Sequence, residues 1–236
     1  LNGRIILSSM FQQMLDLNTY SKLVKTIMVD IIDVGMGNVK SVKNAITRLG
    51  VATNIISNPN DLSSDTIILP GVGSAEPFMY KVRREGFDLA INEHATRGKR
   101  IIGICLGFQV MTHFSEEDGG TQCLGLINTE TTLLRHKEVV LNHNQWEKFS
   151  LRKNQYFFPR LSMSQLGKKK RTINGRVFYN HEYGVRIPVD NSCYKSIDSN
   201  LLSSFASIYC NDNIIGIQFH PEKSQTTGLE VLSFVL

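Results

Sequence analysis

The sequence predicts an α/β fold with a mostly parallel central sheet, helices on both faces of that sheet and an antiparallel extension. In the first half of the chain, apolar runs of strand length alternate with segments of helical periodicity, which is typical of a parallel sheet. The later part shows shorter, partly alternating strands joined by polar turns. The chain has 236 residues, 42% of them hydrophobic and 20% charged, and this suffices for one domain with a full core.

Continuous apolar runs predict the strands that are buried on both faces. These runs are "IMVDIID" (27–33), "VATNIIS" (51–57), "TIILP" (66–70) and "RIIGIC" (100–105). Apolar residues from Val39 to Leu49 recur at helical spacing until Gly50 ends the helix. We expect further helices over roughly 75–97, in "LGFQVMTHF" (106–114) and in "GLEVLSFVL" (228–236).

The segments between residue 115 and residue 220 are expected to extend the same sheet with mixed or antiparallel pairing. No linker and no internal repeat interrupts the chain, so one domain is predicted for residues 28–236. Residues 1–27 are interpreted as an N-terminal extension of uncertain status. Their apolar stretch is short and lacks the small-residue cleavage site of a signal peptide.

The composition disfavours several classes of function. The net charge of +5 is concentrated in part in "KKKR" (168–171), but no base-reading motif accompanies this run, so no nucleic-acid partner is expected. No apolar stretch approaches the length needed to span a bilayer, so no membrane is expected. The four cysteines and six histidines lack disulfide-framework or metal-ligand spacing, and we expect a reduced, cytoplasmic protein without a metal site.

"GICLGFQVM" (103–111) places Cys105 between two glycines at the end of a predicted strand. A strand, a sharp turn and a helix form the nucleophile elbow, the turn that lifts a nucleophilic side chain to the carboxyl edge of a sheet. The positive end of the following helix would favour a thiolate. The alternative is a small buried hydrophobe, the commonest state of a free cysteine.

The candidate base for this thiol is His220 in "NIIGIQFHPEKS". It follows an apolar strand, and Glu222 lies two residues later, which in an extended chain places both side chains on the same side. A bond from Glu222 would then fix the imidazole tautomer. The alternative is that His220, at the end of a strand, has only a structural role.

Backbone amides near Cys105 are candidate donors to an oxyanion. "PGVG" (70–73) follows the third strand, and an amide at Gly71 or Val72 would act together with that of Leu106. An ordinary type II turn explains the same glycines.

These motifs together resemble the class I, triad-type glutamine amidotransferases. "GICLGFQ" with "FHPEKS" carries the resemblance. Within the superfamily, "DVGMGNVKSV", "LPGVG", "SEEDGG", "LGLI" and "GIQFHPEKSQTTGLEVL" are similar to the glutaminase subunit of imidazole glycerol phosphate synthases. The similarity runs from about Met28 to the C-terminus. Related glutaminases of other branches usually carry histidine where this chain has Phe108.

The resemblance implies roles for individual residues. Cys105 would be the nucleophile, His220 the acid and base, and Glu222 the group that orients His220. Gln109, His181, Glu182 and Tyr183 match substrate-binding positions, with Glu182 in place of the usual serine. The chain also departs from the family pattern in "LNHNQW" around His143 and at Val34, where tyrosine is usual.

The implied function is hydrolysis of L-glutamine to glutamate and ammonia, with the ammonia channelled to a (β/α)8 synthase subunit in a heterodimer and with no cofactor. The alternatives are a paralogous amidotransferase that supplies ammonia for surface-polysaccharide sugar amidation, a cysteine hydrolase of the peptidase or chaperone-like type, and an inactive binding subunit.

Overall fold

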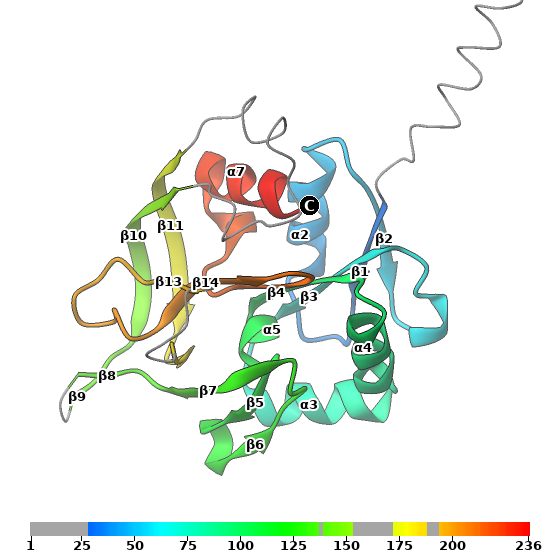
Figure 1. Ribbon diagram of the computed structural model, residues 1–236, viewed down its shortest axis with the longest axis horizontal. Coiled ribbons are helices and arrows are strands. Elements are labelled where there is room, and N and C mark those ends of the chain that lie inside the picture. The colour runs from blue at the N-terminus through cyan, green and yellow to red at the C-terminus, as the bar shows by residue number, and fades with distance from the viewer. Residues whose placement is uncertain (1–27, 137–138, 153–171, 188–193) are drawn as a thin grey trace, which may run out of the picture.

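The computed structural model describes residues 28–136, 139–152, 172–187 and 194–236 (Figure 1). The predicted N-terminal extension and the basic run at 168–171 lie outside the described residues.

A seven-stranded sheet forms the centre of the fold, in the order β13-β14-β15-β4-β3-β1-β2. The five strands from β15 to β2 are parallel, and β14 and β13 add the antiparallel extension, which confirms the predicted α/β fold. The strands are β1 (Met28–Ile32), β2 (Ala52–Ile56), β3 (Thr66–Gly71), β4 (Arg100–Cys105), β13 (Tyr194–Ser196), β14 (Ala206–Asn211) and β15 (Ile214–Ile217).

Helices cover both faces of this sheet. In Figure 1, α2 (Val39–Thr47) and α7 (Gln225–Val235) lie on one face, and α3 (Ala75–Arg84) and α4 (Phe87–Thr96) lie on the other. Each face buries its own apolar cluster, one containing Val29 and Val231 and the other containing Ile32 and Phe87. The central strands are therefore apolar on both sides, as their sequences predict.

The prediction that every later strand extends the same sheet is wrong. A separate four-stranded sheet has the order β12-β7-β5-β6, and β10 pairs with β11 in a long antiparallel hairpin. Residues of β7 alternate between buried and exposed, so β7 needs cover on one face only and lies outside the doubly covered central sheet. These strands are β5 (Thr112–Ser115), β6 (Thr121–Gln122), β7 (Ile127–Leu133), β10 (His143–Arg152), β11 (Thr172–His181) and β12 (Tyr183–Val185), with a small β8–β9 ladder (Arg135–His136, Val139–Val140) between β7 and β10.

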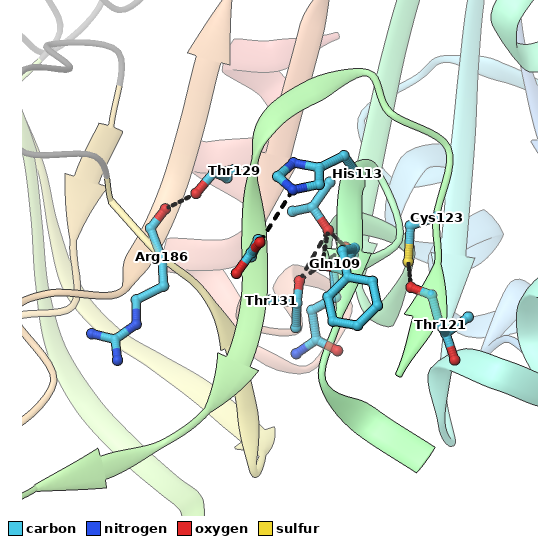
Figure 2. Close-up of polar contacts among 10 residues, drawn as sticks. Gln109, His113, Thr121, Cys123, Thr129, Thr131 and Arg186 are labelled. Atoms are coloured by element: carbon cyan, nitrogen blue, oxygen red, sulfur yellow. Dashed lines mark hydrogen bonds and ion pairs between the residues drawn. The ribbon is translucent and has the colours of Figure 1, made fainter. Parts of the chain in front are cut away.

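The helix predicted over 106–114 is also shorter than expected. Helix α5 (Leu106–Gln109) is a single turn, and the chain then enters β5. The Gln109 carbonyl accepts hydrogen bonds from the hydroxyls of Thr112 (2.7 Å) and Thr131 (3.0 Å), as the dashed line to Thr131 shows in Figure 2. In a longer helix, the Gln109 carbonyl would instead accept a hydrogen bond from a backbone amide of the next turn.

Asp30 is a fully buried acid in the middle of β1, the strand next to the edge strand β2. Its carboxylate accepts hydrogen bonds from the Ser63 and Ser64 amides, both at 2.8 Å, and from the side chains of Ser64 (2.8 Å) and Asn54 (3.1 Å). Burial acts to raise the pKa of Asp30, but these bonds outweigh burial and hold the pKa below its ordinary value. Asp30 therefore fastens the 63–64 loop to β1.

Replacing Asp30 with alanine leaves the buried amide and hydroxyl of Ser64 without their partner and removes the bond to the Ser63 amide, so we expect the free energy of unfolding to fall by about 3 kcal/mol. Urea denaturation followed by circular dichroism measures this loss. Because the folded-state pKa is depressed, the contribution is present at neutral pH and is lost as the pH falls below about 4. The difference in the free energy of unfolding between wild type and Asp30→Asn should narrow over the same pH range.

Asp61→Ala, at an exposed position of the neighbouring 3-10 turn, is the control and should cost far less. Equal losses at Asp30 and Asp61 would contradict the assigned role of Asp30.

Candidate active site

Cys105 ends β4 in a backbone conformation that L-residues rarely adopt, with φ 54° and ψ −112°. The turn is tight because α5 packs directly on β3: a Cβ on Gly107 would lie 1.8 Å from the Leu69 carbonyl oxygen. A Cβ on Gly103 would similarly meet Met111 Sδ at 2.3 Å. The glycines on both sides of Cys105 are thus required by close packing, and the predicted strand–turn–helix arrangement is present.

His220 lies beside Cys105 because β15 pairs with β4 in parallel, with Ile217 opposite Ile104. Cys105 and His220 line the same pocket, and the imidazole Nδ1 lies 2.9 Å from Glu222 Oε1. Since Nδ1 is engaged by Glu222, Nε2 is the nitrogen that remains for Cys105. Burial lowers the pKa of His220, but the bonds and charges of Cys105 and Glu222 outweigh burial and raise it to about 10.

Glu222 reaches His220 by a route that the sequence did not predict. Pro221 begins a 3-10 turn, η3 (Pro221–Lys223), so the chain is not extended between the two residues. The turn brings the Glu222 carboxylate back onto the imidazole, with its side chain only 1% exposed. The Asn38 side-chain amide lies 3.5 Å from the same carboxylate oxygen. Asn38 is a contact of the site that sequence reasoning missed.

Ser224 fastens the turn to β11. Its hydroxyl donates to the His220 carbonyl at 2.6 Å and accepts the Phe178 amide at 3.0 Å. The His220 amide in turn donates to the Phe178 carbonyl at 2.9 Å. The backbone of His220 is therefore tied on both sides to the strand that carries the opposite wall of the pocket.

A pocket of about 80 Å³ opens at Cys105 and brings together segments that are far apart in the sequence. Its lining includes most of the predicted site residues and three that were not predicted, Gly73, Glu117 and Asn180. The lining residues are Val72, Gly73, Cys105, Leu106, Gln109, Glu117, Asn180, His181, Glu182, Tyr183 and His220. The Asn180 carbonyl lies 3.9 Å from Cys105 Sγ.

The wall opposite Cys105 is held by two donors to one carbonyl. The Gln109 side-chain amide and His181 Nδ1 both donate to the Tyr183 carbonyl at 2.6 Å. His181 Nε2 accepts from His143 Nδ1 at 2.8 Å. Burial and the neighbouring His143 lower the pKa of His181 to about 3, so His181 is a neutral donor. In this structure Gln109 and His181 fix the strand, and direct contact of either with a substrate stays a prediction.

One of the predicted oxyanion donors, the Val72 amide, does not point into the pocket as expected. The Val72 amide donates to the Met36 carbonyl at 3.0 Å, so this N–H is already used and does not serve the pocket. This bond joins the "GMGN" segment, which contains Met36, to the "PGVG" segment, which contains Val72. The "PGVG" pattern alone gives no sign of this contact. Gly71 stands opposite Cys105 in the β3–β4 register, and Leu106 follows the thiol.

Glu117 is a second acid of the pocket, from the 3-10 turn η2 (Glu117–Gly119). Its carboxylate accepts the Ala75 amide at the N-terminus of α3 at 2.9 Å. Burial is the main cause that raises the pKa of Glu117 to about 7, and the charges of Asp118 and Glu182 add to the rise. Three consecutive acids in "SEEDGG" were the sequence signal for this residue.

Within the described part of the chain, no three or more His, Cys, Asp and Glu side chains come together in a way that would hold a metal ion. No helix among the described residues is long and apolar enough to cross a membrane.

Comparison with known proteins gives one consistent family. The sequence model for "Glutamine amidotransferase class-I" matches residues 30–234. The chain is 33% identical over 207 residues to the imidazole glycerol phosphate synthase subunit HisH of Listeria monocytogenes serotype 4b, covering 87% of this chain and 93% of that protein. It is 31% identical over 212 residues to the Bacillus subtilis subunit of the same name, covering 87% and 94%.

Solved structures share the fold at low sequence identity. PurLQS from Thermotoga maritima superposes with a TM-score of 0.61 at 17% identity, covering 89% of this chain and 98% of that chain. A further structure titled glutamine amidotransferase superposes with a TM-score of 0.62 at 14% identity, covering 87% and 96%.

Replacing Gly107 with alanine should destabilise the turn at Cys105 strongly, by about 3 kcal/mol, because the new methyl group meets backbone that cannot move aside. Thermal or urea denaturation measures the loss. The control is Gly125→Ala, whose Cβ meets nothing within 4 Å although its φ is +69°. This control isolates the cost of a positive φ, about 1 kcal/mol. Equal costs at both positions would contradict the packing argument.

Replacing Glu222 with glutamine should lower the pKa of His220 by about one pH unit or more, because an amide neither carries the negative charge nor binds imidazolium as strongly. Titration of the imidazole by NMR measures the change. Glu230→Gln on α7 is the matched control and should leave the pKa of His220 as it is. An unaltered value in Glu222→Gln would show that Glu222 does not hold the imidazole.

Proposed function

The chain belongs to the class I glutamine amidotransferases, and we propose that it is the glutaminase subunit of an imidazole glycerol phosphate synthase. In this role it hydrolyses L-glutamine to glutamate and ammonia. The observation that carries the proposal is that Cys105 and His220 line one pocket and that Glu222 is hydrogen-bonded to the imidazole behind it. The similarity to HisH subunits over 87% of the chain supports the assignment of the pathway.

The proposed reaction has two stages. In the first, the proton shared by Cys105 and His220 lies on the imidazole, as the raised pKa of His220 favours, and the sulfur of Cys105 bonds to the carboxamide carbon of glutamine. The C–N bond then breaks as His220 returns the proton to the departing ammonia. In the second, His220 takes a proton from water and hydroxide attacks the thioester carbon. The C–S bond breaks to release glutamic acid, which ionises to glutamate, and the freed Cys105 sulfur is left beside the protonated His220 as at the start. Glu222 keeps the imidazole in the required tautomer throughout.

Charge complementarity supports glutamine as the ligand. The α-ammonium group of an amino acid needs an anionic partner, and Glu117 is a carboxylate of the pocket whose position is fixed by the Ala75 amide. The oxyanion formed at the carboxamide would be held by the Leu106 amide and an amide of the 71–73 turn. With the Val72 N–H directed to Met36, Val72 contributes only after its peptide rotates.

The proposal includes a partner. Ammonia is protonated and loses its nucleophilicity in water, so a (β/α)8 synthase subunit would receive it through a channel in a heterodimer, in the cytoplasm. The domain would run from residue 28 to residue 236. An amidotransferase of surface-polysaccharide sugar amidation is the second candidate, because Glu182 and the altered segment around His143 fit that branch as well as a histidine-pathway subunit.

We expect Cys105→Ala to abolish release of glutamate from glutamine, since no other group of the pocket is a nucleophile of that strength. A coupled assay for glutamate, with the (β/α)8 subunit of the same source present, measures this. A glutamine-analogue chloroketone should label wild type and not Cys105→Ala, by mass spectrometry.

Cys123→Ala is the matched control, because burial raises the pKa of the Cys123 thiol to about 11 and keeps it unreactive. Glutamate release by Cys105→Ala at the wild-type rate would end the proposal. Labelling that follows Cys123 instead would do the same.

A further inference from the structure

Two carboxylates line the pocket that contains Cys105. Turn η2 carries Glu117, and the connection between β11 and β12 carries Glu182. The Tyr183 phenol, next to Glu182, lies in the field of these two acids and of Glu116 and Asp118. Burial first, and then these four charges, raise the pKa of Tyr183.

Among the described residues, no cation of the pocket lining offsets these acids, since that lining includes neither lysine nor arginine. The positive charge that His220 carries when protonated is balanced at 2.9 Å by Glu222. The mouth of the pocket therefore has a net negative field, which a ligand meets before it reaches the thiol.

Glu182 is the acid whose charge acts on ligands most directly. It is exposed at the rim, and the Asn142 side chain lies 3.4 Å from its Oε1 and holds it beside the pocket. Glu117, in contrast, is partly buried, its pKa is raised to about 7, and its carboxylate accepts the Ala75 amide. Near neutral pH a fraction of Glu117 is protonated, so its charge is incomplete.

The ligand gains a negative charge during the proposed reaction. Glutamine is a zwitterion without net charge, whereas glutamate carries one additional carboxylate at the end of its side chain. In a pocket with an acidic rim and no balancing cation, this new charge is repelled while the neutral carboxamide is not.

We propose that Glu182 sets the charge selectivity of the pocket, favouring uncharged or cationic amino-acid amides over glutamate and so promoting release of the product. This inference rests on the proposed glutaminase function and deepens it. Glu182 is then a specificity residue, and it need not contact the reacting atoms.

The test measures binding, so it does not depend on turnover. Isothermal titration calorimetry is carried out on full-length Cys105→Ala and on Cys105→Ala/Glu182→Gln, with L-glutamine, L-glutamate and the cationic L-glutamine α-amide. Removing the charge of Glu182 should strengthen glutamate binding about fivefold and weaken α-amide binding about fivefold, the size expected for one charge pair across a partly hydrated pocket. Glutamine, with no net charge, should change less than about twofold on the same grounds.

Opposite changes in affinity for the anionic and cationic ligands indicate a charge effect. A change in the shape of the pocket would instead change the affinities for all three ligands in the same direction. Both shifts should shrink in high salt, because the rim is exposed. Glu93→Gln on the exposed surface of α4, in the same Cys105→Ala background, is the control and should leave all three affinities unaltered.

Each outcome has a defined meaning. Unchanged ratios between glutamate, glutamine and α-amide in the Glu182→Gln background would overturn the inference and leave the glutaminase proposal standing. If the Cys105→Ala protein binds none of the three ligands, the glutaminase proposal fails and the role of Glu182 fails with it.

Discussion

The contact between α5 and the end of β3 is the constraint on which the site depends. At Gly107 the backbone of α5 lies against the Leu69 carbonyl with no room for a side chain. This approach forces the chain to reverse at Cys105, and the reversal gives Cys105 its positive φ. A residue in that conformation projects its side chain away from both the strand and the helix, toward the carboxyl edge of the sheet. The neighbouring parallel strand β15 ends at the same edge, and it delivers His220 there.

Local sequence patterns were enough to predict the central sheet, the helices α2, α3, α4 and α7, and the meeting of Cys105 with His220. Each of these follows from a continuous apolar run, a helical repeat or the rule that parallel strands end at one edge. The features that sequence reasoning missed depend on partners distant in the chain. Thr131 shortens α5, Met36 engages the Val72 amide, and the Ala75 amide positions Glu117. The contact between His220 and Glu222 was predicted correctly, but for an extended chain instead of the 3-10 turn that makes it.

The pocket separates two kinds of polar group. On its wall, Gln109 and the neutral His181 donate hydrogen bonds to the single carbonyl of Tyr183, so the wall is rigid and carries no net charge. Around its mouth, the polar groups are carboxylates, and the charges of Asp118 and Glu182 act on Glu117. The wall is thus fixed by neutral donors, since an unpaired charge is costly to bury, and the buried charge at the thiol, that of His220, is paired with Glu222.

Ser224 has a mechanical consequence. Its hydroxyl and the Phe178–His220 backbone bond join the acid–base histidine to the same long hairpin that carries Asn180 and His181. The same histidine follows β15, which is paired with β4, so this short segment is bonded both to the hairpin and to the sheet that carries Cys105. The imidazole therefore acts as a fixed joint between the far wall of the cavity and the sulfur, and loss of the Ser224 hydroxyl would loosen the hairpin side of that joint.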